Sequence, residues 1–318
     1  MKKAILVFAL FLTACGDGAT NQNAVATQST PAPVLMPTPV PRQSPDTDLE
    51  RTFAEIAKDA KGKVGVSAVV FETGQNASLN GGERFAMQSV YKVPISMAIM
   101  SAIDAGKYRP DQDVEIRKED FVAAGQASLL RDNFPNGTTI PLWHVIEYAI
   151  SQSDGTASDV LMKMAGGPAA VQKFVNEAKL TDIVIQNTEK ELGKDVKLQY
   201  QNSATPDAAV ALLAELKTGT SIERERGKLI MDFMNESATG PNRLRGMLPE
   251  NAYVAHKTGT SGTRDGVTAA TNDIGLISLP NGNFMAIAVF VGDSSADEKT
   301  RDLIIARIAK AAWDKWGQ

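Results

Sequence analysis

Cysteine and histidine are nearly absent from this chain of 318 residues. Cys15 is the only cysteine, so no disulfide can form within the chain, and His144 and His256 are the only histidines. Because metal centres draw several ligands from such residues, the composition disfavours metal catalysis, and we expect no metal and no other cofactor. The chain also lacks long runs of Lys and Arg and carries a net charge of −4, which argues against nucleic acid as a partner.

The first fourteen residues combine two lysines with a short apolar stretch. Lys2 and Lys3 precede Ala4–Leu12, which is too short to cross a bilayer as a helix and is typical of a secretory signal peptide over residues 1–14. Leu-Thr-Ala then directly precedes Cys15, which resembles the lipobox of a bacterial lipoprotein. We expect export to the periplasmic side, with Cys15 lipidated as the only membrane contact. The alternative is an ordinary signal peptide and a soluble periplasmic protein.

Residues 15–47 are rich in Pro, Thr, Gln and Ala. This composition favours extended, solvated chain and offers little apolar surface to bury. We interpret the segment as a tether between Cys15 and a folded domain over residues 48–318, which we expect to be monomeric.

Strand-like segments lie near both ends of the folded domain, around a helical middle. A β-branched run starts near residue 64, and three more apolar runs lie after residue 250, while residues 93–230 show helical spacing. This order predicts a two-layer α/β fold with an antiparallel sheet and flanking helices, built from residues 48–88 and 241–318. Residues 89–240 form an inserted all-helical part, and we expect the active site at the interface of the two parts.

Ser89 and Lys92 form the only Ser-x-x-Lys motif in the chain, directly before the apolar segment 93–106. That composition predicts a buried helix that starts near Ser89, with Lys92 one turn further along the same face. A serine becomes a nucleophile when a base takes its proton, and burial makes a lysine a better base. The pair therefore indicates a nucleophilic serine, although a solvated lysine at a helix start would fit the same letters.

Two more short motifs follow in order, Ser153-Asp154-Gly155 and Lys257-Thr258-Gly259. A second Lys-Thr-Gly, at residues 217–219, ends a helical segment where lysine and glycine are capping signals, whereas the copy at 257–259 follows a strand. Ser-x-x-Lys, Ser-Asp-Asn and Lys-Thr-Gly together are the signature of class A β-lactamases and penicillin-binding proteins. Over residues 48–318 the chain resembles a class A serine β-lactamase.

The resemblance implies a reaction and a set of roles. The chain would hydrolyse the β-lactam ring of penicillin- and cephalosporin-type antibiotics through an acyl-enzyme on Ser89, with Ser153 relaying a proton to the leaving nitrogen. The backbone N–H groups of Ser89 and Thr260 would form the oxyanion hole. The substrate carboxylate would be bound by Lys257, Thr258, Gly259 and Thr260.

Two further assignments rest on the same resemblance. Glu189 lies in Asn187–Gly193, which resembles the family's Glu-x-x-Leu-Asn loop, and would activate the water that hydrolyses the acyl-enzyme. Whether Lys92 or water held by Glu189 deprotonates Ser89 stays open. Arg243 matches an arginine that helps to hold the substrate carboxylate in some family members, although Arg245 or a structural ion pair would also fit.

Gly155 and Gly193 depart from the family pattern, because each replaces an asparagine. We expect altered recognition of the acylamino side chain from the first change and slower deacylation of some substrates from the second. Two rival functions share the serine motifs, namely a penicillin-binding DD-peptidase and a lipoprotein that senses β-lactams without fast turnover. Glu189 favours the hydrolase over both, because neither rival needs an efficient water-activating carboxylate.

Overall fold

The computed structural model describes residues 42–318. The predicted signal peptide, Cys15 and most of the predicted tether lie outside these described residues. Within residues 42–318 no helix is both long and apolar enough to cross a membrane. The same residues contain no group of three or more His, Cys, Asp or Glu side chains placed to hold a metal ion.

One antiparallel sheet joins the two ends of the described chain. Its strands run in the order β2-β1-β11-β10-β8, with the short β9 (Thr263–Arg264) paired to β10. The five main strands are β1 (Lys63–Val70), β2 (Asn76–Leu79), β8 (Val254–Thr260), β10 (Val267–Ser278) and β11 (Phe284–Ser294). Because β1 pairs with β11 along its whole length, the N- and C-terminal segments form a single sheet, as predicted.

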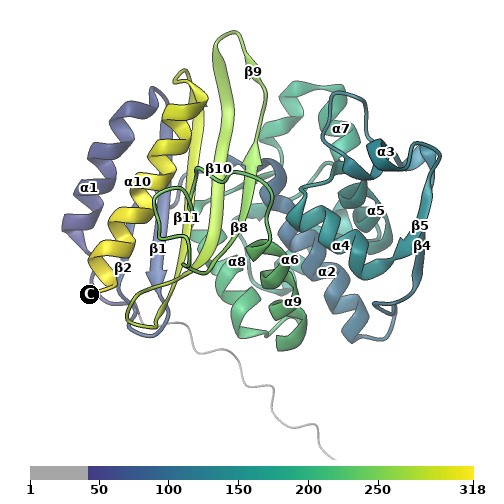
Figure 1. The fold of residues 1–318 in the computed structure, drawn as a ribbon, viewed down its shortest axis with the longest axis horizontal. Coiled ribbons are helices and arrows are strands. Elements are labelled where there is room, and N and C mark those ends of the chain that lie inside the picture. The colour runs from purple at the N-terminus through teal and green to yellow at the C-terminus, as the bar shows by residue number, and fades with distance from the viewer. Residues whose placement is uncertain (1–41) are drawn as a thin grey trace, which may run out of the picture. The chain divides into compact units, whose positions relative to one another are not determined.

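Two helices cover one face of this sheet (Figure 1). They are α1 (Thr47–Ala57) and α10 (Glu298–Trp316), which pack on each other and enclose an apolar core with the strands. The other face contacts α8 (Pro206–Thr218), which lies against β1 and β11. Burial on both faces explains why β1 and β11 read as nearly continuous apolar runs instead of alternating ones.

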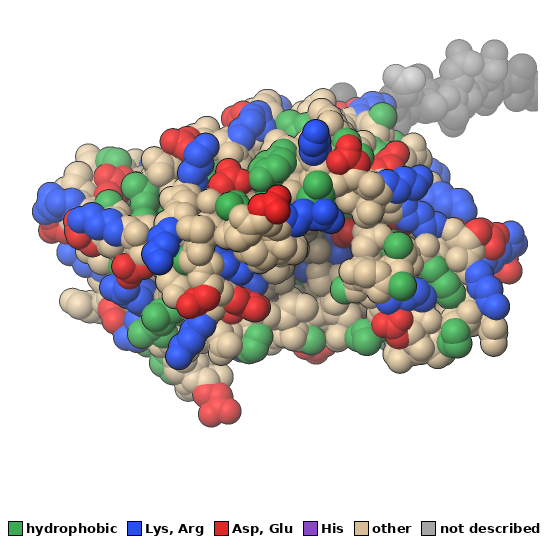
Figure 2. All heavy atoms as spheres, turned by 90° about the horizontal axis from the view of Figure 1, so that it is seen from above, with side chains coloured by type: hydrophobic (Ala, Val, Ile, Leu, Met, Phe, Trp, Pro, Cys, Tyr) green, Lys and Arg blue, Asp and Glu red, His purple; other side chains and the backbone are tan. Residues whose placement is uncertain are grey.

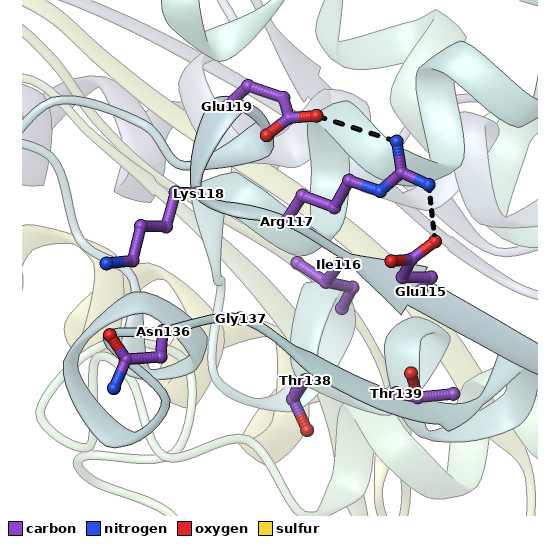
Figure 3. Close-up of a pocket in the computed structure, with 9 residues that line it drawn as sticks. All are labelled: Glu115, Ile116, Arg117, Lys118, Glu119, Asn136, Gly137, Thr138 and Thr139. Carbon is purple, nitrogen blue, oxygen red and sulfur yellow. Dashed lines mark hydrogen bonds and ion pairs between the residues drawn. The ribbon is translucent and has the colours of Figure 1, made fainter.

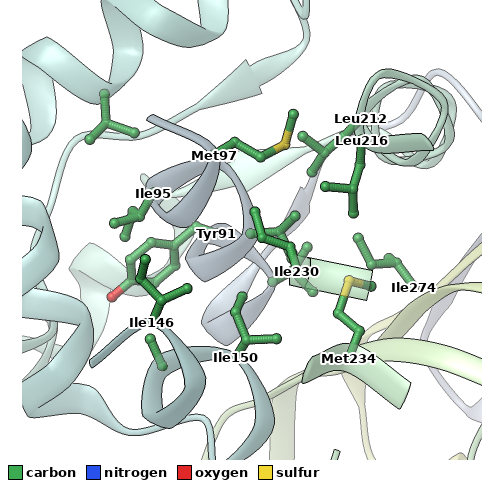
Figure 4. Close-up of a cluster of buried hydrophobic side chains, with 14 of the residues drawn as sticks. Tyr91, Ile95, Met97, Ile146, Ile150, Leu212, Leu216, Ile230, Met234 and Ile274 are labelled. Carbon is green, nitrogen blue, oxygen red and sulfur yellow. The ribbon is translucent and has the colours of Figure 1, made fainter. Parts of the chain in front are cut away.

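Helices form the rest of the domain, around α2 (Lys92–Asp104). Most side chains of α2 are buried and none is exposed, and Figure 4 shows Ile95 and Met97 of this helix among apolar side chains from α4, α8, α9 and β10. The surrounding helices are α4 (Leu142–Ser151), α5 (Gly155–Ala165), α6 (Pro168–Glu177) and α9 (Arg224–Asn235). The sheet, the flanking helices and this helical part confirm the predicted fold class.

Short elements complete the helical side. The helices α3 (Leu129–Asn133) and α7 (Glu189–Lys194) have only a turn or two. Two small sheets pair β4 (Asp113–Ile116) with β5 (Thr138–Pro141), and β3 (Phe85–Ala86) with β7 (Ser203–Ala204) and β6 (Ile183–Val184). Single 3-10 turns occupy Lys58–Ala60, Gln88–Tyr91, Lys118–Asp120 and Val196–Tyr200.

The start of α2 differs from the prediction. Instead of a helix from Ser89 onward, a 3-10 turn over Gln88–Tyr91 leads into α2, which begins at Lys92. Gln88 has a φ of 48°, a backbone conformation that residues other than glycine rarely adopt. This bend places Ser89 at the junction between the sheet and the helical part.

Candidate active site

A cavity of about 700 Å³ lies between β8 and the helical part. Figure 2 views the molecule from the end where β9 and α7 lie in Figure 1, and the surface there is hollowed near its centre. Six of the predicted site residues line the cavity: Ser89, Lys92, Ser153, Glu189, Thr258 and Thr260. Residues more than 170 positions apart in the sequence therefore meet in one place.

Lys92 is the centre of this group. Its ammonium donates to the Ser89 hydroxyl at 2.9 Å, to the Ser153 carbonyl at 2.7 Å, and forms an ion pair with Glu189 at 2.8 Å. An ammonium has three N–H donors, so these three acceptors satisfy it fully. The Lys92 side chain is only 2% exposed, which makes the ion pair with Glu189 necessary to hold its charge.

Glu189 is held in place through its backbone. The carboxylate of Asp159, on α5, accepts the N–H of Glu189 at 2.7 Å and that of Lys190 at 3.0 Å. Thr188 and Glu191 form a capping box at the same end of α7, which fixes where this short helix begins. Because the backbone is tied on both sides of its Cα, the Glu189 carboxylate is directed at Lys92.

The charges around Glu189 set its protonation. Burial raises the pKa of this carboxyl, but the Lys92 ammonium, the Tyr91 hydroxyl and the Lys257 charge together lower it by more, so the net pKa lies below the ordinary value. The Tyr91 hydroxyl is buried beside this group, and burial together with the Glu189 charge raises the pKa of Tyr91 well above its usual range. Glu189 is therefore a carboxylate in the resting site, which a general base requires.

Ser153 and Lys257 form a second close pair. The Lys257 ammonium donates to the Ser153 hydroxyl at 2.8 Å and to its neighbouring carbonyl, Thr258 O, at 3.2 Å. Lys257 is fully buried. Its burial, and to a smaller extent the nearby positive charge of Lys92, lower its pKa well below the value of a free lysine. Ser153 has a φ of 56°, so the backbone itself is bent to present this hydroxyl to Lys257.

Gly259 explains the close approach of β8 to the turn that carries Ser89. A Cβ at this position would lie 2.3 Å from the carbonyl oxygen of Met87, a backbone atom, so only glycine fits. Asn272 on β10 supports the same turn, because its amide donates to the carbonyls of Ala86 and Met87. Thr260 ends β8 beside this turn and lines the cavity.

Arg243 does not line the cavity; Lys257 and Gly259 do not line it either, but Lys257 contacts the cavity residue Ser153. The Arg243 guanidinium is 4% exposed, pairs with Asp302 of α10 at 2.7 Å and donates to the Asn272 carbonyl at 3.0 Å. Arg245 also bonds backbone carbonyls, those of Asn235 and Val254. In this geometry both arginines serve as structural contacts, which is the alternative that the sequence left open.

Three residues of the site were missed by the sequence reasoning. Asp159 had a signal, since it is an acid within the apolar helical run of α5. Tyr91 stood inside the Ser-x-x-Lys motif without an assigned role. Gln126 had no signal, because it lies in a loop without periodicity; its amide donates to the Glu189 carbonyl at 2.5 Å.

A second, shallower cavity of about 370 Å³ lies over the β4–β5 hairpin. Figure 3 shows Arg117 there between Glu115 and Glu119, which neutralise it. None of the predicted site residues lines this cavity, and its carboxylates pair with Arg117 at an exposed surface. We therefore assign the chemistry to the larger cavity.

Comparisons with known proteins all point to one family. The profile of the Beta-lactamase enzyme family matches residues 48–316. Beta-lactamase VEB-1 from Pseudomonas aeruginosa is 40% identical over 269 residues, which cover 84% of this chain and 90% of that protein. Extended-spectrum beta-lactamase PER-1 from the same organism is 33% identical, over 83% of this chain and 86% of that protein.

Solved structures agree with these sequence matches. A beta-lactamase from Chitinophaga pinensis is 40% identical, with a TM-score of 0.82 over 84% of this chain and 99% of that chain. TLA-1 extended spectrum beta-lactamase is 36% identical, with a TM-score of 0.83 over 86% of this chain and 99% of that chain. The similarity therefore extends over nearly all of the described domain.

Proposed function

The chain belongs to the beta-lactamase enzyme family, and we propose that Ser89 is the nucleophile with which it opens the β-lactam ring of penicillin- and cephalosporin-type antibiotics. One observation carries the proposal: Lys92 contacts both the Ser89 hydroxyl and the Glu189 carboxylate within 3 Å. This arrangement gives the nucleophile a route by which its proton can leave.

Acylation begins when Ser89 Oγ attacks the lactam carbonyl and its proton passes to a base. The base is Lys92, after it has given a proton to Glu189, or a water held by Glu189. The backbone N–H groups of Ser89 and Thr260 donate hydrogen bonds to the carbonyl oxygen and stabilise the negative charge that develops on it. As the C–N bond breaks, Ser153 relays a proton: it gives its own to the leaving nitrogen and receives in return the proton that the base took from Ser89. Lys257, whose ammonium lies 2.8 Å from the Ser153 hydroxyl, stabilises that oxygen during the transfer.

Substrate binding draws on the same strand. Thr258 and Thr260 line the cavity, and the buried Lys257 of the same strand contacts the cavity residue Ser153. We propose that the substrate carboxylate is bound along Lys257, Thr258, Gly259 and Thr260, where the positive charge of Lys257 favours an anion. Direct binding by Arg243 is not part of this proposal, because its guanidinium is already paired with Asp302.

Deacylation needs a water and a base. Glu189 takes a proton from a water as it attacks the ester carbonyl, and the ester C–O bond breaks to return the proton to Ser89. We expect a Glu189→Gln variant to acylate but not to release product, because the amide cannot accept that proton. Intact-protein mass spectrometry after mixing with a chromogenic cephalosporin should show the added mass of the opened drug.

A matched control is Glu177→Gln on α6, where the carboxylate is exposed, pairs with Lys173 and does not line the cavity. That variant should turn over repeatedly, like the parent protein. Full turnover by Glu189→Gln would contradict the assignment of Glu189. A single stoichiometric burst from the parent protein, with a stable acyl-enzyme, would favour a DD-peptidase or a sensor instead.

We also propose that the protein acts on the periplasmic side, anchored through a lipid on Cys15. The support is the sequence alone: a charged start, a short apolar stretch, small residues before the cysteine, and the Pro-rich tether. Membrane fractionation of cells that express Cys15→Ser should move the activity from the membrane to the soluble periplasmic fraction. Sedimentation of the purified domain should give a monomer.

A further inference from the structure

A single loop packs against both glycines that stand where the family has asparagine. Residues 122–127, here called the cavity loop, run along the cavity between the 3-10 turn Lys118–Asp120 and α3. At Gly155, a Cβ would lie 3.2 Å from the Ala127 carbonyl and 3.3 Å from Val122. At Gly193, the three nearest atoms all belong to the amide of Gln126.

The fit at Gly193 is tighter than normal contact. A Cβ there would lie 2.5 Å from Gln126 Oε1, 2.7 Å from Cδ and 3.0 Å from Nε2, so no side chain fits while this amide stays in place. The Gln126 amide is fixed by two hydrogen bonds. Its Nε2 donates to the Glu189 carbonyl at 2.5 Å, and its Oε1 accepts the Ala123 N–H at 3.3 Å.

Backbone conformation does not explain the glycine. Gly193 lies inside α7 and is not among the glycines with a positive φ. Within a helix, glycine is about 1 kcal/mol less favourable than alanine. Its advantage here is the absent Cβ, which leaves room for Gln126 to reach the Glu189 carbonyl.

We propose that Gln126 is a positioning residue for Glu189, and that its amide takes the place of the side chain missing at residue 193. This inference rests on the proposed role of Glu189 as the base for deacylation. Asp159 holds the two N–H groups at the start of α7, and Gln126 holds the carbonyl of the same residue from the opposite side of the peptide. Together they fix the backbone from which the Glu189 carboxylate projects.

Two single variants should have the same effect for different reasons. Gln126→Ala removes the amide. Gly193→Ala adds a Cβ that displaces it, and because the displaced group is the end of a flexible side chain, the fold is kept. We expect each variant to lower the deacylation rate about tenfold, because one hydrogen bond that orients the base is lost. The acylation rate should be nearly unchanged.

The double variant gives the decisive measurement. Both changes break the same hydrogen bond, the one between the Gln126 amide and the Glu189 carbonyl. The deacylation rate of Gln126→Ala/Gly193→Ala should therefore fall about tenfold, and not the hundredfold that independent effects would give. Stopped-flow release of the chromophore reports acylation, and decay of the acyl-enzyme mass reports deacylation. Multiplying losses, or a Gly193→Ala variant with undiminished deacylation, would overturn the proposal.

Two controls separate the inference from general damage. Gly82→Ala is the matched glycine change, because a Cβ there meets nothing within 4 Å and the residue lies outside the cavity. It should match the parent protein in rate and thermal unfolding. Gln199→Ala removes another cavity amide, which bonds Gln88, and its effect should multiply with that of Gly193→Ala.

The outcomes also separate this inference from the proposed function. If Glu189→Gln traps the acyl-enzyme while the losses at 126 and 193 multiply, Glu189 is the base and Gln126 does not position it. If Glu189→Gln turns over fully, the proposed function itself fails. Should Gly193→Ala unfold at a lower temperature than the parent, Gln126→Ala decides alone, and undiminished deacylation in that variant overturns the inference.

Discussion

Asp159 links the protonation of a buried carboxyl to the geometry of Glu189, the proposed base. Its two oxygens accept the N–H groups of Glu189 and Lys190. The charges of Glu189 and Lys92 also affect its pKa. Burial raises the pKa of Asp159 from 3.8 to about 6, although the two backbone N–H bonds act in the opposite direction. The group therefore titrates near the lower end of the pH range in which enzymes are usually assayed.

The sign of the stability effect follows from that raised pKa. A carboxyl whose pKa is higher in the folded state favours folding while it is protonated, and this contribution is lost as the pH rises through about 6. A difference of one between two pKa values is worth about 1.4 kcal/mol, so ionisation of Asp159 costs about 3 kcal/mol in total. Between pH 4 and pH 8 we expect about 2–3 kcal/mol of this cost to develop.

Asp159→Asn removes the titration while keeping the shape and one acceptor oxygen. The free energy of unfolding, measured in urea from pH 4 to pH 8 for both proteins, should show the parent losing about 2–3 kcal/mol relative to the variant as the pH rises. Deacylation should change in the other direction. In the parent it should fall below about pH 6, because a protonated Asp159 accepts the two N–H groups less well, and in Asp159→Asn this step should be absent.

The free energy of unfolding is the decisive part of this test. Parallel stability curves for the two proteins would refute the reasoning, since they would mean that Asp159 has the same pKa in the folded and unfolded states. A deacylation profile that keeps its step near pH 6 in Asp159→Asn would assign that step to another group.

Three other changes test the remaining parts of the site. Tyr91→Phe removes a hydroxyl that lowers the pKa of Glu189, so the acid limb of deacylation should move to higher pH, and an unmoved limb would contradict this influence. Lys257 has a pKa lowered by burial, so KM for carboxylate-bearing lactams should rise with pH well below 10.5, whereas Lys257→Arg should keep KM flat over that range. Arg243→Ala leaves Asp302 unpaired and should lower the free energy of unfolding by about 3–5 kcal/mol, measured in urea, with little change in KM. A large rise in KM with intact stability would restore the role in substrate binding.

The predictable part of the fold is the part with strong local patterns. The segments that form α2 and β1 are buried over most of their length, so their sequences are apolar or β-branched almost throughout. These patterns alone indicated a helix and a strand. The two-residue strands β3, β6 and β7 could not be predicted, because two residues show no period. They pair only because the tertiary structure brings residues 85, 183 and 204 together.

The candidate site divides in the same way. Ser89, Lys92, Ser153 and Lys257 belong to short motifs whose order along the chain is informative, and the structure places their polar atoms within 3 Å of a partner in the set. The role of Arg243 in substrate binding stays a prediction, and its position fourteen residues before Lys257 did not indicate the ion pair with Asp302 on α10 that the structure shows.

The two glycines show what a motif comparison leaves out. Read against the family pattern, Gly155 and Gly193 are losses of two asparagine side chains, and slower deacylation follows. The structure shows that the cavity loop packs closely against both positions: Val122 and the Ala127 carbonyl lie next to Gly155, and the Gln126 amide fills the space beside Gly193. A substitution to Asn at residue 193 would therefore compete with Gln126 for one space and would not simply restore a missing contact. The effect of a residue at one position of this site depends on the residue at the other, so the glycine and the glutamine are best understood as one unit.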